Sequence, residues 1–314
     1  MSNVLAFSDH IPLMDDFKNH LDMNSKDPST IDAYIRVMRQ FMEWLLQRPG
    51  SGGRFQTDLL TKNALQTFIN ELEDQGYSVS HRNRVKTVVG QFANWMLEEK
   101  GIHVKNPSKN IVIPPQEQLA PRELSLDQRY ILKNLIERAG DERSAAMFAL
   151  GYWAACRSSD VTNFLVRNAD IGPKIGVITV GHKAGKMRKL DILNEVRGPL
   201  YNYLKSETRK FPDSPFVFTS KRSERLTENG LHRWFNKIKT DSRKDEWILI
   251  EDITFHDLRH DFAHRARKAG WKLEEIALYL GHINNQGTAA IQSTVRYTQP
   301  TREQLKRRLL DIKG

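Results

Sequence analysis

The chain has 314 residues, an apolar content of 39% and a formal net charge of +10. This length favours two domains over one, and the apolar fraction allows each domain to bury a core. No apolar run is long enough to span a bilayer, and the first residues lack the features of a signal peptide. Cys156 is the only cysteine in the sequence, which excludes an intramolecular disulfide, and we expect a cytoplasmic protein.

The positive charge is unevenly distributed along the chain. Residues 1–113 contain 13 basic and 13 acidic residues, which leaves 35 basic and 25 acidic residues in the remainder. A basic surface favours a polyanionic partner because its contacts to phosphates release counterions. A basic surface without such a partner is also common. Charge therefore supports a nucleic-acid partner but does not identify a reaction.

The first third of the sequence predicts a small helical bundle. Residues 30–46 place apolar side chains on one helix face, with Ser29 and Thr30 as candidate caps. Two more helices are predicted, one after Thr61 and one over residues 80–99. Only a short stretch precedes the first of these helices.

The third predicted helix begins with a basic run, His81-Arg82-Asn83-Arg84-Val85-Lys86. Cations at one end of a helix, with apolar residues on its other face, suit docking onto DNA. A solvated helix end has the same pattern, and the sequence does not separate the two interpretations.

Several prolines between Asn106 and Arg122 exclude a continuous helix, and they predict a linker over residues 107–122. We therefore expect one domain over residues 1–106 and a second over residues 123–314. The second domain opens with a capping-box pattern at Ser125-Leu126-Asp127-Gln128.

The second domain is predicted to be helical around a small antiparallel sheet. After a helix over residues 143–156, the period changes to that of a strand at 175–180. A turn at Lys183-Ala184-Gly185-Lys186 leads into a second strand over 187–193, and residues 216–218 suit a further short strand. Helices resume afterwards. The predicted fold class is mainly α with a small antiparallel sheet.

Two arginines of the second domain suit a phosphodiester. Attack on a phosphodiester places more negative charge on its non-bridging oxygens, and planar guanidinium groups match that geometry while staying protonated. Arg157 and Arg259 are the candidates for such a clamp. Each could instead form a structural ion pair, and Asp160 is a credible partner for Arg157.

Histidines accompany these arginines. His256 lies three residues before Arg259, so the two share a helix face, and His256 could donate to a phosphate or move a proton. His260 and His264 extend a row that could hold zinc, although the sequence lacks the glutamate of the zinc-peptidase pattern. Leu280-Gly281 precedes His282, and the glycine is expected to end a helix and turn His282 outward.

Tyr297 is the candidate nucleophile. Its phenol needs nearby cations to attack at neutral pH, because its ordinary pKa is near 10. Tyr279 is a rival, but it lies on an amphipathic helix and is expected in the core. Lys183, at the predicted hairpin turn, could protonate the leaving oxygen. Alternatives near Lys183 are Lys186, Arg188 and Lys189.

Together these residues resemble the tyrosine recombinase (phage integrase) family, over nearly the whole chain. The resemblance rests on Arg157 with Asp160, on Lys183, on His256-x-x-Arg259, on Leu280-Gly281-His282 and on Tyr297. Because only a short stretch precedes the first predicted helix, the chain resembles a compact Xer-like or transposon-encoded member of the family. Two features depart from the family: the interval from His282 to Tyr297 is several residues longer, and Cys156-Arg157 replaces a Gly-aliphatic-Arg setting.

The resemblance implies a site-specific recombinase that cleaves and rejoins duplex DNA through a 3′-phosphotyrosyl intermediate, without cofactor or metal. Arg157, Arg259 and His282 would hold the phosphate, Lys183 would serve the leaving group, and His256 would assist proton transfer. It also implies a core-binding-like first domain, a catalytic second domain, and a homotetramer on two DNA sites. A C-terminal helix over 301–313 would be exchanged between protomers. Whether accessory proteins take part is not readable from the sequence.

Two other functions compete with this expectation. A type IB topoisomerase uses similar chemistry to relax supercoiled DNA, and a DNA-binding regulator could keep the fold without activity. The Leu280-Gly281-His282 element disfavours the topoisomerase. The regulator is disfavoured because a candidate residue is present at all six catalytic positions, namely Arg157, Lys183, His256, Arg259, His282 and Tyr297. The DNA target sequence and the choice among integration, excision, resolution and inversion are not readable from the chain.

Overall fold

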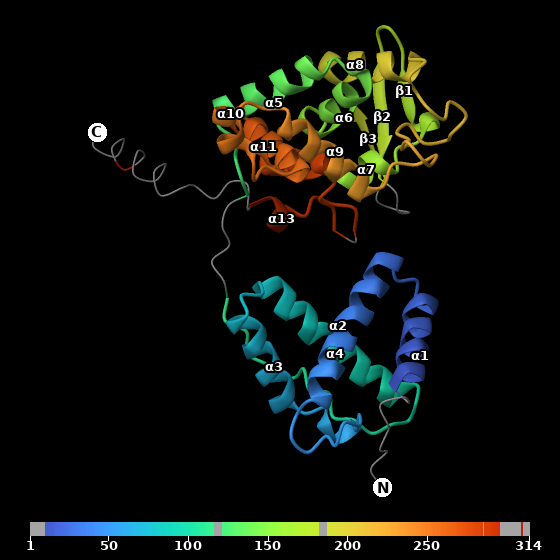
Figure 1. The fold of residues 1–314 in the computed structure, drawn as a ribbon, viewed down its shortest axis with the longest axis vertical. Helices are drawn as coiled ribbons and strands as arrows, with labels where there is room; N and C mark the ends of the chain where they lie inside the picture. The colour runs from blue at the N-terminus through green and yellow to red at the C-terminus, as the bar shows by residue number, and fades with distance from the viewer. Residues whose placement is uncertain (1–9, 116–120, 182–186, 285, 296–308, 310–314) are drawn as a thin grey trace. The chain divides into compact units, whose positions relative to one another are not determined.

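The structure is a computed structural model that describes residues 10–115, 121–181, 187–284 and 286–295, together with Leu309. The chain divides into two compact units, Met1–Glu117 and Gln118–Gly314 (Figure 1). Each unit has its own hydrophobic core. None of the helices in the described part of the chain combines the length and apolar character that a membrane span requires.

The described part of the first unit is a bundle of four α-helices. These are α1 (His10–Met23), α2 (Pro28–Leu46), α3 (Lys62–Asp74) and α4 (Val79–Glu98). The last three confirm the predicted helices, whereas α1 was not predicted as a helix. The predicted caps of α2, Ser29 and Thr30, are wrong: the helix is capped by Asp27, whose side chain accepts from the Ser29 backbone. Thr61 caps α3 by accepting from Ala64.

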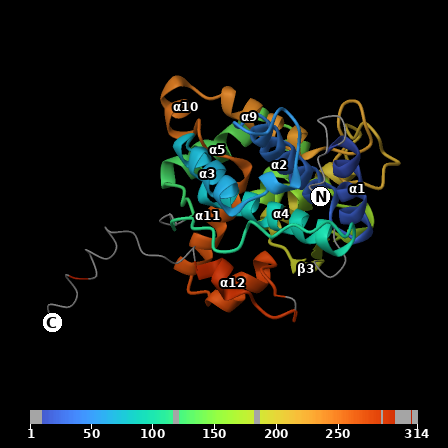
Figure 2. The same ribbon diagram turned by 90° about the horizontal axis from the view of Figure 1, so that it is seen from below.

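Helix α2 packs against α1, α3 and α4 (Figures 1 and 2). The apolar side chains of these helices form one core. An aromatic cluster of Phe17, Phe92 and Trp95 joins α1 to α4. The basic run at the start of α4 is partly structural. Arg82 is buried and pairs with Glu73 at 2.7 Å. The solvated helix-end interpretation is therefore wrong for Arg82, which is not available to DNA either.

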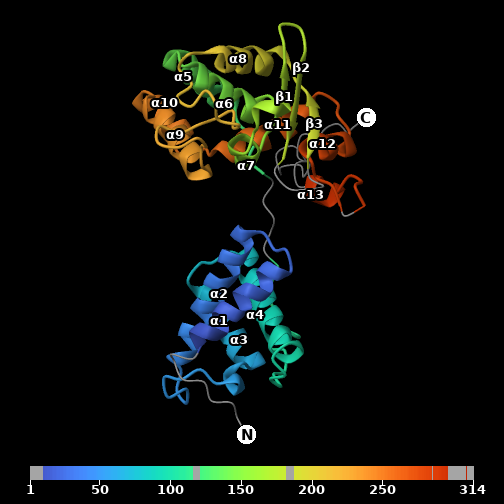
Figure 3. The ribbon, with the colours of Figure 1, turned by 90° about the vertical axis from the view of Figure 1, so that its right-hand side faces the viewer.

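The second unit combines helices with a three-stranded sheet. Its strands are β1 (Ala169–Ile171), β2 (Gly176–Val180) and β3 (Arg188–Asp191). Its helices are α5 (Leu126–Ala139), α6 (Glu142–Tyr152), α7 (Ser158–Thr162), α8 (Asn194–Lys205), α9 (Glu228–Thr240), α10 (Lys244–Ile250), α11 (Phe255–Lys268), α12 (Leu273–Leu280) and α13 (Ile291–Val295). The order in the sheet is β1-β2-β3, with both pairs antiparallel. Figure 3 shows β3 as the strand nearest α12.

The structure confirms most predicted elements of this unit and corrects two. The Ser125 capping box is present, and the two predicted strands correspond to β2 and β3. The helix predicted to reach Cys156 ends at Tyr152, because the chain then turns sharply. The strand predicted over residues 216–218 is wrong: Phe216 forms a single bridge to Leu165 and no ladder.

Helix α6 is central to the second core, where it contacts α5, α7, α8 and α11. Gly151 of α6 allows the start of α11 to approach closely. A Cβ atom at Gly151 would lie 2.7 Å from Cζ of Phe255, so any larger residue would push the two helices apart. This contact brings α11 against the end of α6, which places Arg259 beside the turn that leads to Arg157.

Candidate active site

Arg157 lies at a sharp turn between α6 and α7. Ala155 has φ of 51°, a left-handed conformation that costs free energy for a residue with a Cβ atom. Two residues later, Arg157 precedes the first residue of α7, and its backbone N–H donates to Oδ2 of Asp160 at 2.9 Å. The Arg157 side chain donates from Nη2 to the Gly281 carbonyl oxygen at 3.3 Å. The turn therefore ties Arg157 to the end of α12.

Arg259 is the largest fully buried side chain in the described residues, with 1% exposure. It donates from Nη1 to the Ala155 carbonyl oxygen at 2.6 Å, and from Nη2 to the Leu280 carbonyl oxygen at 2.5 Å. The first turn of α11 is fixed by Asp257, whose carboxylate accepts from the Thr254 backbone and hydroxyl. The guanidinium thus links the α6–α7 turn to the end of α12.

His282 follows Gly281, which ends α12 with φ of 67°, and this confirms the predicted left-handed glycine. Nε2 of His282 lies 3.2 Å from Nη2 of Arg259. Because an arginine can only donate, Nε2 is the acceptor of this hydrogen bond in the neutral ring. The proton is then on Nδ1, which donates to Oγ1 of Thr294 at 3.0 Å.

Burial lowers the pKa of His282 to about 3, and the charges of Arg259, Arg157 and Arg188 act in the same direction. The imidazole is therefore neutral at physiological pH in the protein without a ligand. A bound anion would oppose the three arginine charges and raise this pKa.

Within the long interval after His282, the chain folds back on itself. Ile283 forms an antiparallel bridge with Ala289, and the side chain of Asn284 accepts from the backbone of Thr288. The chain then returns to its start, because the Ala290 N–H donates to the His282 carbonyl oxygen at 2.7 Å. Helix α13 begins at Ile291, directly after this return.

His256 and His260 lie on the exposed face of α11, with ring centroids 4.4 Å apart. Partial removal of His256 from water, with the charge of Arg259, lowers its pKa. His264 belongs to a different surface, where its Nε2 lies 2.8 Å from the Pro121 carbonyl oxygen. Within the described residues, no three acidic, histidine or cysteine side chains form a group able to hold a metal ion.

Two predicted site residues, Lys183 and Tyr297, lie outside the described residues, as does Lys186. Among the alternatives to Lys183, Arg188 is 9% exposed and pairs with Asp160 at 2.8 Å. The rival nucleophile Tyr279 stacks on Phe262 at 5.1 Å. Burial raises the pKa of Tyr279 to about 12, so it is a poor nucleophile at neutral pH.

Three segments far apart in the sequence thus meet at the Gly281 turn. They bring together the guanidinium groups of Arg157 and Arg259 and the imidazole of His282, with His256 on the adjoining helix face. Two guanidinium groups held by backbone carbonyls, with an imidazole held by the side chains of Arg259 and Thr294, suit an anion whose charge increases during a reaction. Sequence reasoning missed Thr294 as the partner of His282, and Arg188 as the partner of Asp160.

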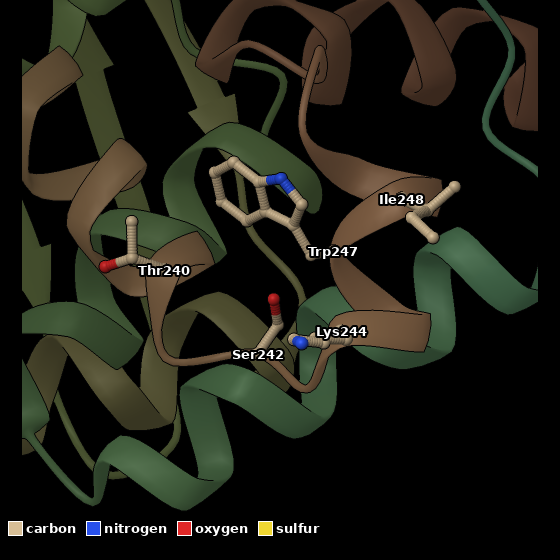
Figure 4. A pocket seen from close by; sticks show the side chains of 5 residues that line it. All are labelled: Thr240, Ser242, Lys244, Trp247 and Ile248. Atoms are coloured by element: carbon tan, nitrogen blue, oxygen red, sulfur yellow. The ribbon is translucent and has the colours of Figure 1, made fainter.

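A separate hollow of about 430 Å³ lies where α9 is followed by α10. Its lining residues are Thr240, Ser242, Lys244, Trp247 and Ile248. Figure 4 shows the indole of Trp247 beside the short polar side chains of Thr240 and Ser242. The lining includes none of the site arginines or histidines, so the hollow is not part of the candidate active site.

The model of the phage integrase family matches residues 124–304, which is more than half of the chain and includes the site described above. The chain belongs to the phage integrase family. It is therefore a tyrosine recombinase, a DNA strand-transferase that cleaves and rejoins DNA at specific sites.

Relatives in this family match over most of the chain. A TnP I resolvase from Bacillus thuringiensis is 25% identical over 301 residues, covering 93% of this chain and 97% of the relative. The tyrosine recombinase XerA from Pyrococcus horikoshii is 26% identical over 303 residues, covering 94% and 91%.

Solved structures share the fold. The Tn1549 transposon integrase in complex with transposon right end DNA has a TM-score of 0.69 at 15% identity, covering 94% of this chain and 98% of that chain. The XerH site-specific recombinase bound to difH substrate has a TM-score of 0.68 at 16% identity, covering 89% and 78%.

Proposed function

We propose that this tyrosine recombinase cleaves duplex DNA through a 3′-phosphotyrosyl intermediate, with Tyr297 as the nucleophile. The observation that carries the proposal is the meeting of Arg157, Arg259 and His282 at one turn. Tyr297 would attack the scissile phosphate and release a 5′-hydroxyl. A 5′-hydroxyl of a partner duplex would then attack the phosphotyrosine, which exchanges one phosphoester for another of similar energy.

Arg157 and Arg259 would bind the non-bridging oxygens of the phosphate. Carbonyl oxygens hold both side chains in place before DNA arrives, so little reorganisation is needed as charge develops. His282 would hold the same phosphate once the anion raises its pKa. His256, one turn before Arg259 on α11, would assist proton transfer.

Lys183 and Tyr297 are assigned to the reaction by the family resemblance and by their places in the chain. Lys183 belongs to the connection between β2 and β3, and the first residue of β3 is Arg188, which contacts Asp160. Thr294, which accepts from His282, precedes Tyr297 by three residues, and three residues of chain span at most about 11 Å. Lys183 would protonate the leaving 5′-oxygen.

The proposed partner is double-stranded DNA, bound by residues 1–106 and 123–314, with residues 107–122 as a linker. The basic excess of the chain after residue 113 supports a polyanionic partner. Solved relatives of the same fold are complexes with DNA, and a lambda integrase tetramer is bound to a Holliday junction. We infer a homotetramer on two recombining sites.

Trapping the covalent complex tests the proposal. The purified protein is incubated with fragments of its native genome, denatured, and the DNA that stays attached is sequenced. Wild-type protein should retain a specific sequence, whereas Tyr297→Phe should retain none. Tyr279→Phe is the matched control and should trap DNA as the wild type does, because Tyr279 packs on Phe262.

Other outcomes would overturn the proposal. Covalent trapping by Tyr297→Phe would exclude the assigned nucleophile. Relaxation of any supercoiled plasmid without a site requirement would indicate a type IB topoisomerase. Specific binding without cleavage of a nicked site would indicate a DNA-binding regulator.

A further inference from the structure

Arg188 is a third arginine beside the candidate active site. It is the first residue of β3, and its side chain is 9% exposed. Its Nη2 donates to Oδ2 of Asp160 at 2.8 Å, and the same oxygen accepts from the backbone N–H of Arg157 at 2.9 Å. One carboxylate oxygen therefore joins the side chain of Arg188 to the backbone of Arg157.

Arg188 also packs against the turn that carries His282. A Cβ atom at Gly281 would lie 3.0 Å from Cδ and 3.3 Å from Nη1 of Arg188. The carbonyl oxygen of Gly281 accepts from the side chain of Arg157. Arg188 thus contacts both structures that hold Arg157, namely the carboxylate of Asp160 and the turn at Gly281.

The burial of Arg188 is costly for a purely structural side chain. Its Nε and Nη1 are buried and have no hydrogen-bond acceptor among the residues that the structure describes. A buried ion pair contributes little net stability compared with apolar residues of similar size. Its charge does have a use here, because Asp160 without a partner would repel a phosphate held by Arg157.

We propose that Arg188 is a positioning residue for DNA cleavage: it fixes Arg157 against the Gly281 turn and neutralises Asp160, so that the bound scissile phosphate lies in the correct position for attack. This inference rests on the proposed function. Arg188 acts through Asp160 and Gly281 and does not touch the phosphate itself.

The test is single-turnover cleavage of a nicked DNA that carries the site trapped by the wild-type protein. Arg188→Gln should lower the rate constant of cleavage on the order of 100-fold, as expected when a reacting group is misplaced. The dissociation constant for the same DNA should change by less than about threefold, because the lost interaction acts on the reaction step. The slope of log affinity against log salt should not change, because no phosphate contact is removed.

Arg197→Gln is the matched control. Arg197 donates to the Gly172 carbonyl oxygen and packs against Gly176, as Arg188 packs against Gly281, but it contacts no site residue. Its removal should leave the cleavage rate constant at the wild-type value. Adding Asp160→Asn to Arg188→Gln should restore part of the lost rate, because the amide keeps an acceptor for Arg157 and removes the uncompensated charge.

Three results would overturn the inference. Wild-type cleavage by Arg188→Gln would exclude the role, and a salt slope reduced by about one would indicate a direct phosphate contact instead. A double variant slower than Arg188→Gln would exclude neutralisation of Asp160. If thermal unfolding shows that Arg188→Gln does not fold, Arg188→Met, which fills similar space without a charge, is used in the same assay, and full-rate cleavage by that variant is the contrary result. A wild-type protein that forms no covalent complex contradicts the proposed function itself.

Discussion

The charge of His282 determines what the site can do before DNA binds. Burial and the neighbouring arginines lower its pKa to about 3 in the folded protein. The unfolded chain, with an ordinary histidine pKa near 6.5, binds this proton at a higher pH than the folded chain does. The contribution of His282 to the free energy of unfolding is therefore complete above about pH 6.5, and it is lost as the pH falls toward about 3. Within that window, one proton changes the unfolding free energy by ~1.4 kcal/mol for each pH unit.

We expect His282→Gln to remove this dependence. Glutamine keeps a donor and an acceptor for Thr294 and Arg259 but does not titrate. Denaturant unfolding between about pH 6 and pH 5 should show a loss of free energy that is shallower than in wild type by ~1.4 kcal/mol per pH unit. His103→Gln, at an exposed position of the first unit, serves as the control. If the unfolding free energy of wild type and of His282→Gln fell equally with pH, the lowered pKa of His282 would be contradicted.

Ala155 gives a second prediction, because its left-handed backbone places a carbonyl oxygen against Arg259. A β-branched residue adopts this conformation with difficulty. Ala155→Val should destabilise the protein by about 2 kcal/mol more than Ala154→Val does. Ala154 is equally buried but has no positive φ, so the pair separates backbone strain from crowding. Equal losses of unfolding free energy in both variants would show that crowding alone matters.

Sequence reasoning reached the site residues that carry their own local pattern. His256 and Arg259 are three apart on one helix, and His282 follows a helix-ending glycine, so spacing alone relates each to its neighbours. Sequence reasoning could not predict the contact of Arg188 with Asp160 or that of His282 with Thr294. Those contacts depend on how the edge of the sheet and the chain after His282 pack against α12, and no sequence period records that.

Among the elements, α11 is tied to the beginning of the second unit by a buried carboxylate. Asp261 has 0% exposure and accepts from the Leu124 N–H at 3.1 Å, from Arg129 at 2.7 Å and from Arg265 at 2.9 Å. Asp261 lies two residues after Arg259, so the contacts that fix the chain at Leu124 also fix α11.

Asp261→Asn should therefore destabilise the second unit strongly. The amide leaves two arginine charges without their buried partner, and a loss of about 3–5 kcal/mol in unfolding free energy is expected. Asp245→Asn is the control, because Asp245 is exposed and lies 3.6 Å from Arg243. That variant should change stability by less than about 1 kcal/mol. Denaturant unfolding measures both, and similar losses in the two variants would contradict a special role for Asp261.

Elements with a cap and a long apolar period were predictable, and short elements were not. Thr61 and Ser125 each marked a helix start because their side chains satisfy backbone N–H groups there. Strand β1 has three residues, too few for a period, and it exists because Ile178 and its neighbours on β2 supply the pairing. Phe216 had the composition of a strand, but no ladder forms beside it.

At the scale of the whole molecule, each unit has a hydrophobic core of its own, and the basic excess of the sequence is confined to the part after residue 113. If both units bind the same duplex, the first contact holds the second unit at a high effective concentration. The joined chain should then bind much more tightly than either unit alone.

Cutting the chain between the units tests this expectation. A protease site inserted between Pro115 and Pro121 should allow cleavage that leaves both units folded, because each has its own core. We expect affinity for the trapped DNA site to fall by about 10²–10⁴-fold after cleavage, measured by mobility shift at one fixed salt concentration. Wild-type protein treated with the same protease is the control and should keep its affinity. A cleaved chain that binds as tightly as the intact one would show that a single unit supplies all of the binding.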